Sequence, residues 1–428
     1  MDIASWNTFW ILLVFALGYS AIILEHYIKI NKGASALLIA VLCWTIYLYS
    51  SAAPVSEDIK ELGHHVSDVS QIIFFLMGAM TLVELVDSHK GFKIITDRIN
   101  TKSKRKMLWI IALVAFFLSS VLDNLTTTIL MVSLLKKIVP ERAERLLLGC
   151  VIVIAANAGG AWTPIGDVTT TMLWINGQLT SVSVIKALFI PSIVSLLVPL
   201  AYFSWRTKGK LPPLPKESKN AKSEPGAKLV LALGVGGLIF VPIFKGLTGL
   251  PPFMGILLAL GVLWLVTDLM HYKHNEREHL RVPHILTRVD TSGVLFFLGI
   301  LLCVNALQTA GILQALASWL DATVHNQAMI ATLIGIFSAI IDNVPLVAAT
   351  MGMYPLTVFP TDSSLWHMIA YAAGTGGSML IIGSSSGVAL MGLEKIDFVT
   401  YAKKAALPVL VGFLAGMGVY LLLSPWFT

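Results

Sequence analysis

Ser119-Ser120-Val121-Leu122-Asp123-Asn124-Leu125-Thr126-Thr127-Thr128 places one acid inside an otherwise apolar stretch, because no other charged residue lies between Met107 and Leu135. A second polar stretch, Ile340-Ile341-Asp342-Asn343-Val344-Pro345, repeats the Asp-Asn pair far downstream. An ionisable residue inside a membrane is costly and therefore marks a functional site. The two Asp-Asn pairs are predicted to form the core of an ion-transport site.

The composition identifies the kind of protein that carries these two stretches. Of 428 residues, 56% are hydrophobic and 13% are charged, whereas soluble domains average about 25% charged residues. The chain is therefore predicted to be a polytopic membrane protein. Its net charge of +6 comes from short basic runs between apolar spans, as in cytoplasmic loops. It does not indicate a nucleic-acid partner, and the three cysteines lie in apolar runs without metal-ligand spacing.

A span that crosses about 30 Å of hydrocarbon needs roughly 20 apolar residues. Two segments, 107–138 and 327–353, do not fit this length. As one helix, 107–138 would be about 48 Å long, and each half after a break at Asp123 would be only about 23 Å long. A re-entrant hairpin fits better in both places. The expected spans are 7–24, 34–53, 70–87, 146–175 (interrupted), 183–205, 228–244, 251–270, 291–309, 364–393 (interrupted) and 398–423.

The basic residues predict the topology. The segment 107–138 has basic flanks on both sides, so both of its ends are expected to be cytoplasmic. Its counterpart 327–353 has neutral or acidic flanks and is expected to enter from the outside. Both termini then lie outside, and only Lys60, Lys186 and Lys245 among the lysines and arginines are left on that side. This agreement supports the topology.

A Pro- and Lys-rich connector at 206–227 divides the chain into two halves that match each other. The matches are Phe74-Phe75 with Phe296-Phe297, Asp123-Asn124 with Asp342-Asn343, Gly159-Gly160 with Gly376-Gly377, and Pro191 with Pro408. Each half, 1–205 and 228–428, has five transmembrane spans, one of them interrupted, plus one re-entrant hairpin. An odd number of spans inverts the second half. The predicted fold class is an all-α polytopic membrane protein with two inverted-topology repeats, as in secondary transporters.

The first candidate ion site combines the hairpin corner with the interruption at 157–170. Gly159, Gly160, Pro164 and Gly166 would unwind a membrane helix, which is tolerated at depth only where the backbone is buried in protein or lines a cavity. The Asp, Asn, Ser and Thr side chains nearby offer hard oxygen ligands, which suit small alkali cations. We predict Na⁺ at Asp123, Asn124, Asn157 and Asp167, with Ser119, Thr163, Thr169 and Thr170 as further ion-binding residues.

The second candidate site is similar but carries less charge, because Ser384 stands at the repeat position of Asp167. Proton and cation exchange is therefore predicted at Asp123 and Asp167, with Asp342 completing or balancing the site. A carboxylate can hold either a proton or, when ionised, a sodium ion, and such competition produces antiport if the two gates open in turn. No cofactor is implied. The second-half candidates are Ser338, Asp342, Asn343, Thr375, Ser378, Ser384, Ser385 and Ser386.

These motifs resemble a known family. The Asp-Asn corner, the stretch Asn157-Ala158-Gly159-Gly160-Ala161-Trp162-Thr163-Pro164-Ile165-Gly166-Asp167-Val168-Thr169-Thr170 and the stretch Ile341-Asp342-Asn343-Val344-Pro345 are similar to those of NhaD-type sodium/proton antiporters. Their wider superfamily includes sodium-coupled dicarboxylate carriers and arsenite permeases. The resemblance implies export of Na⁺ or Li⁺ at alkaline pH by a homodimer that moves like an elevator. It also implies a bacterial cytoplasmic membrane, with lipid as the only other partner and neither nucleic acid nor a soluble protein bound.

Several alternatives stay open. Asp123, Asp342 and Asp167 could cap the helices that follow them, and this role is compatible with ion binding. The Ser384–Ser386 run could provide small residues for close helix packing. A dicarboxylate or arsenite carrier could use the same scaffold, although no Arg lies in the span interiors. A passive channel is also compatible with these residues, whereas an intramembrane aspartyl protease lacks its expected Gly-x-Gly-Asp motif.

Overall fold

The computed structural model describes residues 6–51, 53–93, 101, 103–210, 224–396 and 398–426. In this part of the chain the secondary structure is helical, apart from one isolated bridge between Ser103 and Lys210. The helices are α1 (Trp6–Ile23), α2 (Glu25–Ile28), α3 (Lys32–Ser50), α4 (Val55–Ser88), α6 (Lys104–Leu122), α7 (Asn124–Ile138), α8 (Arg142–Gly160), α9 (Val168–Ile175), α10 (Ser181–Arg206), α11 (Ala227–Thr248), α12 (Pro252–His271), η1 (Asn275–Leu280), α13 (Val282–Ile285), η2 (Leu286–Arg288), α14 (Thr291–Thr309), α15 (Ile312–Val324), α16 (Gln327–Phe337), α17 (Asn343–Met353), α18 (Ser364–Gly376), α19 (Ser385–Glu394), α20 (Phe398–Tyr401), η3 (Ala402–Ala406), α21 (Leu407–Leu423) and η4 (Ser424–Trp426).

Length and hydropathy confirm the predicted class. Within the described ranges, nine helices are long and apolar enough to cross a membrane. They are rich in Leu, Ile, Val and Phe, and many of these side chains remain exposed on the outside of the molecule. Such an apolar exterior suits a lipid environment rather than water. The chain is an all-α, multi-pass membrane protein.

Both predicted hairpins are interrupted near their Asp-Asn pairs. α6 and α7 pack against each other and are separated only by Asp123. In the second half, residues 338–342 separate α16 from α17, and α16 packs on α18 while α17 packs on both α14 and α18. In each half the aspartate lies at the corner between the two helices of the pair.

The two predicted interruptions are also present, although each is shorter than expected. α8 continues as a helix through Gly160, and the break covers residues 161–167 before α9 begins. α18 continues through Gly376, and α19 begins at Ser385. Gly159 is required by close packing, because a Cβ there would lie 2.1 Å from the carbonyl oxygen of Phe116. At the equivalent position, a Cβ added to Gly376 would lie 2.1 Å from the carbonyl oxygen of Gly335.

Two helix boundaries and one additional helix differ from the sequence-based expectation. α4 begins at Val55 instead of near residue 70, because the polar residues 57–68 extend the same helix. α3 begins at Lys32, because the side chain of Asn31 caps it. The helix α15, which follows α14 after Gly311, was not predicted, because at 13 residues it is too short to span a bilayer. Most of the predicted connector 206–227 lies outside the described residues.

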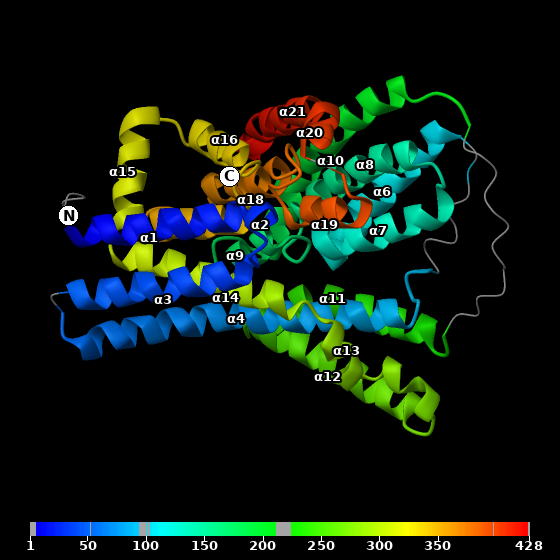
Figure 1. Cartoon of the computed structure of the whole chain (residues 1–428), viewed down its shortest axis with the longest axis horizontal. Helices are drawn as coiled ribbons and strands as arrows, with labels where there is room; N and C mark the ends of the chain where they lie inside the picture. Colours follow the sequence, from blue (N-terminus) through cyan, green and yellow to red (C-terminus); the bar gives the residue numbers. More distant parts are fainter. Residues whose placement is uncertain are drawn as a thin grey trace.

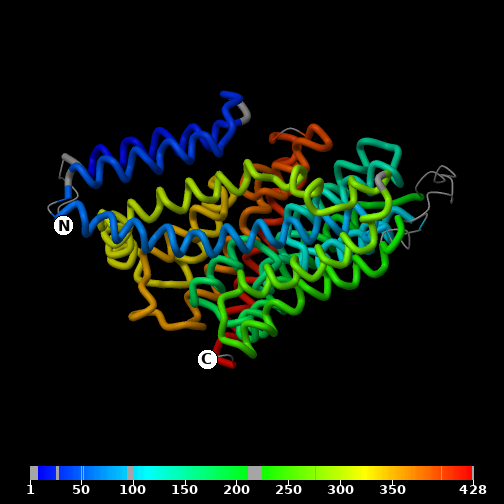
Figure 2. The backbone as a smooth tube through the Cα atoms, turned by 90° about the horizontal axis from the view of Figure 1, so that it is seen from below, coloured from blue at the N-terminus to red at the C-terminus, as the bar shows by residue number. Residues whose placement is uncertain are grey.

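The helices form two groups according to their packing contacts. The hairpin bundle consists of α6–α10, α16–α19 and α21; the outer helices are α1, α3, α4, α11, α12 and α14. Figure 1 shows α6, α7 and α8 toward one end of the long axis, with α15 and α16 toward the other. Figure 2 shows α1 and α3 as a pair along one edge of the molecule.

Candidate functional site

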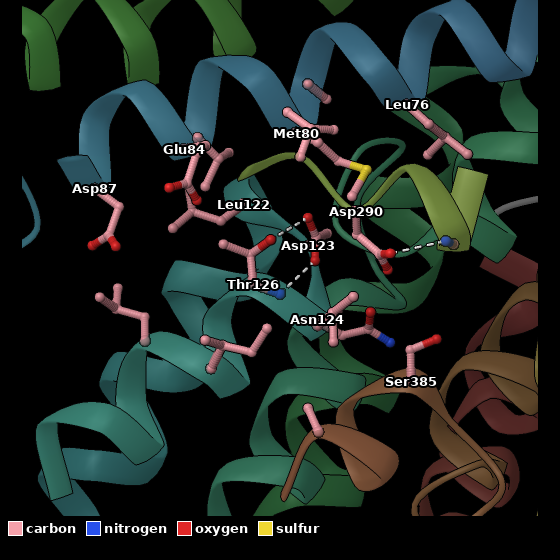
Figure 3. A pocket seen from close by; sticks show the side chains of 18 of the residues that line it. Leu76, Met80, Glu84, Asp87, Leu122, Asp123, Asn124, Thr126, Asp290 and Ser385 are labelled. Atoms are coloured by element: carbon pink, nitrogen blue, oxygen red, sulfur yellow. Dashed lines mark hydrogen bonds between the residues drawn. The ribbon is translucent and has the colours of Figure 1, made fainter. Parts of the chain in front are cut away.

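Asp123 forms the corner between α6 and α7. Its φ of +92° is rare for a residue other than glycine and typically occurs where the surrounding contacts impose it. Here Oδ1 accepts a 2.8 Å hydrogen bond from the Thr126 amide, and Oδ2 accepts a 2.9 Å bond from the Thr126 hydroxyl. The half-buried carboxylate therefore caps α7 and also faces a cavity, as Figure 3 shows.

Asp167 lies deeper, where 1% of its surface is exposed. Its Oδ1 accepts hydrogen bonds from the amide and the hydroxyl of Thr169, at 2.8 and 2.7 Å, and caps α9. Its Oδ2 accepts a 2.6 Å bond from the side-chain amide of Asn124. All three of these donors are neutral groups. The same Asn124 amide also donates to Asn157 Oδ1 at 3.0 Å.

Asn157 connects the two halves of the chain. Its Oδ1 accepts bonds from Asn124 and, at 2.6 Å, from the Ser386 hydroxyl. Its Nδ2 donates to the hydroxyls of Ser378 and Ser384, both at 2.9 Å. The Asn157 side chain is completely buried, and the low local dielectric makes every bond of such a network important. The Asn157 side chain thus connects the corner between α6 and α7, called the first helix pair, to both sides of the α18–α19 break.

Most of the other predicted hydroxyls are bonded to the backbone. Ser119 donates to the carbonyl of Ala156 and Thr163 donates to that of Ser120. Thr170 donates to the carbonyl of Asp167 at 2.9 Å. In this conformation these three hydroxyls stabilise the unwound segment. Thr127 and Thr128 on α7 differ, because their buried hydroxyls have no hydrogen-bond partner in the described part of the chain.

The second half repeats several of these contacts. Ser338 donates to the carbonyl of Ala373, as Ser119 does to that of Ala156. Asp342 caps α17 as Asp123 caps α7, and Ser384 caps α19 as Asp167 caps α9. The prediction that the three aspartates could be helix caps is confirmed. Thr375 bonds the carbonyl of Tyr371, and Ser385 lines the cavity.

Two features distinguish the second half. The carboxylate of Asp342 is paired with Lys32 of α3, whose Nζ lies 3.1 Å from Oδ2. Asn343 is buried, and its Nδ2 has no partner among the described residues. The structure therefore does not place the three aspartates in one hydrogen-bonded cluster. Asp167 and Asp342 are held by different partners.

A cavity of about 770 Å³ lies between the outer helices and the hairpin bundle. Its walls include Asp123, Asn124 and Ser385 from the bundle. Glu84 and Asp87 of α4 and Asp290 before α14 project from the other side, as Figure 3 shows. Asp123 is thus accessible from the cavity, whereas Asp167, Asn157 and Asp342 are not among its lining residues. Basic residues of the lining are Lys32, Lys90, Lys93, Lys137 and Arg288.

The sequence patterns did not single out Lys32, the cavity acids or the buried hydroxyls of Thr127 and Thr128, which have no partner among the described residues. Lys32 had a recognisable signal, because a lysine in the first turn of a helix faces the unfavourable end of the helix dipole and needs another partner. Glu84 and Asp87 lie near a helix end, where a charged side chain ordinarily reaches the interface. Only packing reveals that they face a common cavity.

Comparisons with known proteins identify relatives over nearly the whole chain. A family model described as "Citrate transporter" matches residues 19–368. Sodium/proton antiporter 2 of Arabidopsis thaliana is 53% identical over 96% of this chain and 98% of the plant protein. Sodium/proton antiporter 1 of the same plant is 55% identical over 96% of this chain and 71% of that protein. The Na(+)/H(+) antiporter NhaD of Vibrio cholerae is 30% identical, with 96% and 91% coverage.

Proposed function

The chain belongs to the family of NhaD-type sodium/proton antiporters, which are transporters rather than enzymes, and we propose that it exchanges cytoplasmic Na⁺ for external H⁺. The observation that carries this proposal is the juxtaposition of Asp123, on the cavity wall, with the buried Asn124–Asp167 contact directly behind it. Oxygen ligands from carboxylates and side-chain amides suit a small alkali cation. Li⁺ would use the same ligands.

The proposed exchange is a competition between a cation and a proton for the same carboxylates. A sodium ion in the cavity reaches Asp123 first, because that carboxylate faces the cavity. It reaches Asp167 only when the Asn124 amide, now bonded to Oδ2, turns away. A proton on either carboxyl removes the charge that attracts the cation. The pair would therefore carry either Na⁺ or H⁺, with Asp342 as a third carboxylate.

The direction of the cavity follows from its charges. Lys90, Lys93 and Lys137 line it, and basic residues gather on the cytoplasmic side of membrane proteins. We infer that the cavity is the cytoplasmic entrance and that this conformation faces inward. Cytoplasmic Na⁺ would enter past Glu84 and Asp87, whose carboxylates attract cations.

The two halves are proposed to be inverted-topology repeats that support alternating access. The repeated contacts of Ser119 and Ser338, and of Gly159 and Gly376, support this proposal. The division into outer helices and a hairpin bundle would allow the bundle to move as an elevator against a scaffold. A homodimer with both termini outside, in contact only with lipid, is proposed as well. Because the relatives come from a plant and from bacteria, the bacterial cytoplasmic membrane stays a prediction.

Reconstituted vesicles test the function directly. The purified protein is placed in acid-loaded vesicles with a pH-sensitive dye, and Na⁺, Li⁺, K⁺ or citrate is added in turn. Proton movement after Na⁺ or Li⁺ supports the proposal. A carboxylate carrier is the second candidate, because the matching family model is described as a citrate transporter. Proton movement, or uptake of labelled citrate, only when citrate is added would refute the antiporter proposal.

A single substitution then tests the site. In Asp123→Asn the side-chain oxygen can still cap α7, but the charge is lost, so exchange should disappear while the protein stays folded. Asp362→Asn is a matched control, because Asp362 also has positive φ and accepts bonds from the amide and hydroxyl of one threonine, Thr180, in an exposed loop. Wild-type exchange by Asp123→Asn would move the exchange site elsewhere.

A further inference from the structure

Lys32 occupies an unusual position at the start of α3. A cation in the first turn of a helix is disfavoured by the helix dipole. Its ammonium instead lies 3.1 Å from Asp342 Oδ2 and 4.2 Å from the centroid of the Phe296 ring. A carboxylate and the face of an aromatic ring are both favourable partners for a cation. The Lys32 side chain is thus held at the corner between α16 and α17, called the second helix pair.

The backbone of Lys32 is anchored on α2 and on the outer helices. Its amide donates to the Glu25 carboxylate at 3.1 Å. The neighbouring Asn31 side chain accepts bonds from the Gly33 amide and from the Ser292 hydroxyl of α14. α3 also packs along α14. The ammonium therefore belongs to the outer helices, whereas its partner Asp342 belongs to the hairpin bundle.

The ion pair lies beside the proposed exchange site. Lys32 lines the same cavity as Asp123, and the side chains of Lys32 and Asp342 are only 23% and 12% exposed. Charges with this little exposure interact more strongly than fully exposed surface charges, and removal of one leaves the other uncompensated. The corner of the second helix pair therefore already contains a cation that the protein supplies itself.

We propose that Lys32 is a tethered cation that occupies the Asp342 carboxylate and so confines exchangeable sodium to Asp123 and Asp167. This inference rests on the proposed exchange function and assigns Asp342 a narrower part in it. While the ion pair of Lys32 and Asp342 is formed, the corner between α16 and α17 contributes no net charge to the cavity. Without Lys32, Asp342 would offer a carboxylate to the transported cation.

Substitutions of Lys32 and of Asp342 should change the apparent affinity for Na⁺ in opposite directions. Lys32→Gln leaves a free carboxylate, so the apparent affinity for Na⁺ should rise on the order of tenfold. Asp342→Asn leaves an unpaired ammonium beside the cavity, so the affinity should fall by a similar factor. The double variant, which lacks both charges, should return to within about twofold of the wild type, since neither charge remains. Lys32→Arg should restore the affinity toward the wild-type value.

The affinity is measured in two ways. One is the KM for Na⁺ in the vesicle assay; the other is the rise in Tm of detergent-purified protein with Na⁺ concentration, which does not depend on turnover. Lys29→Gln is the control, because Lys29 is exposed three residues earlier. If Lys32→Gln and Asp342→Asn lower the Tm without shifting the Na⁺ affinity in opposite directions, the inference is overturned. The ion pair would then be purely structural. Failure of the exchange function itself appears separately, as a wild type without Na⁺-driven proton movement.

Discussion

The Asn124 amide donates a 2.6 Å hydrogen bond to Oδ2 of the buried Asp167. This bond joins the start of α7 to the break between α8 and α9. Asn124 lines the cavity, whereas Asp167 lies behind it and is 1% exposed. The amide therefore separates the deeper carboxylate from the cavity in this conformation. Ion binding at Asp167 requires this contact to open.

The substitution Asp167→Asn should lower exchange by about a hundredfold or more while the helices stay folded. An asparagine can still cap α9 through its oxygen. Its amide would face the Asn124 amide, and one unsatisfied buried donor costs about 1–3 kcal/mol. Initial exchange rates in vesicles with equal amounts of protein measure the effect. A rate within threefold of the wild type would contradict a role for this carboxylate.

Replacement of Asn157 should weaken both the fold and the function. Asn157→Ala removes four side-chain hydrogen bonds in a completely buried position, which should cost about 2–4 kcal/mol and most of the exchange activity. Asn176→Ala is the control, because that amide donates one partly buried bond to the Met172 carbonyl. The melting temperatures of the two purified variants should differ by several degrees. Equal melting temperatures would show that the network contributes little.

The ion pair between Arg145 and Glu394 should stabilise the contact between α8 and α19. Arg145 Nε lies 3.1 Å from a Glu394 oxygen, and the glutamate side chain is 3% exposed. Arg145→Met should therefore destabilise the protein by about 3–5 kcal/mol, because it leaves a buried carboxylate unpaired. The more exposed pair of Arg281 and Asp268 gives the comparison. Arg281→Met should cost only about 0–1 kcal/mol, and an equal cost for both variants would contradict the argument.

The contact between His89 and His271 should make stability depend on pH. His89 follows α4, is fully buried, donates from Nδ1 to the Leu85 carbonyl, and places Nε2 3.0 Å from Nε2 of His271. Burial holds the pKa of His89 below its ordinary value. The folded state therefore binds fewer protons than the unfolded state. The contribution of neutral His89 to stability is complete above about pH 6.5, and it is lost progressively as the pH falls from there through the lowered pKa of the folded state.

Thermal unfolding, followed over an assay range from pH 8 to pH 5.5, measures how the free energy of unfolding depends on pH. The loss per pH unit should approach about 1.4 kcal/mol on the acid side and should shrink in His89→Gln. His274→Gln, which changes an exposed histidine, should leave the pH dependence as in the wild type. The same acid-side loss in all three proteins would assign it to other groups.

Much of the fold was predictable because a membrane imposes simple rules on the sequence. The span length identified the long helices, and the mismatch of 107–138 with that length predicted the break at Asp123, which is confirmed. The predictions were less accurate for α4 and α15, because polar residues extended one helix and the other is too short to span. The inverted arrangement of the two repeats stays a prediction.

The candidate site was predictable in its residue types but not in its connections. The motif around Asn157 and Asp167 identified polar residues that the structure brings together. Their partners could not be derived, because Asn157 bonds to serines more than 220 positions away. Lys32 and Asp342 lie 310 positions apart, and no local pattern links them.

The sequence by itself determined that this chain is a polytopic membrane protein with two Asp-Asn corners and two broken helices. It did so because hydrophobic length and an isolated charge in an apolar run are local properties that a bilayer constrains strongly. Only the tertiary structure decided which carboxylate is accessible and which is paired. Asp123 faces the cavity, Asp167 lies behind Asn124, and Asp342 is neutralised by Lys32. Those differences arise from packing between distant helices, which places neutral donors around one acid and a cation beside another.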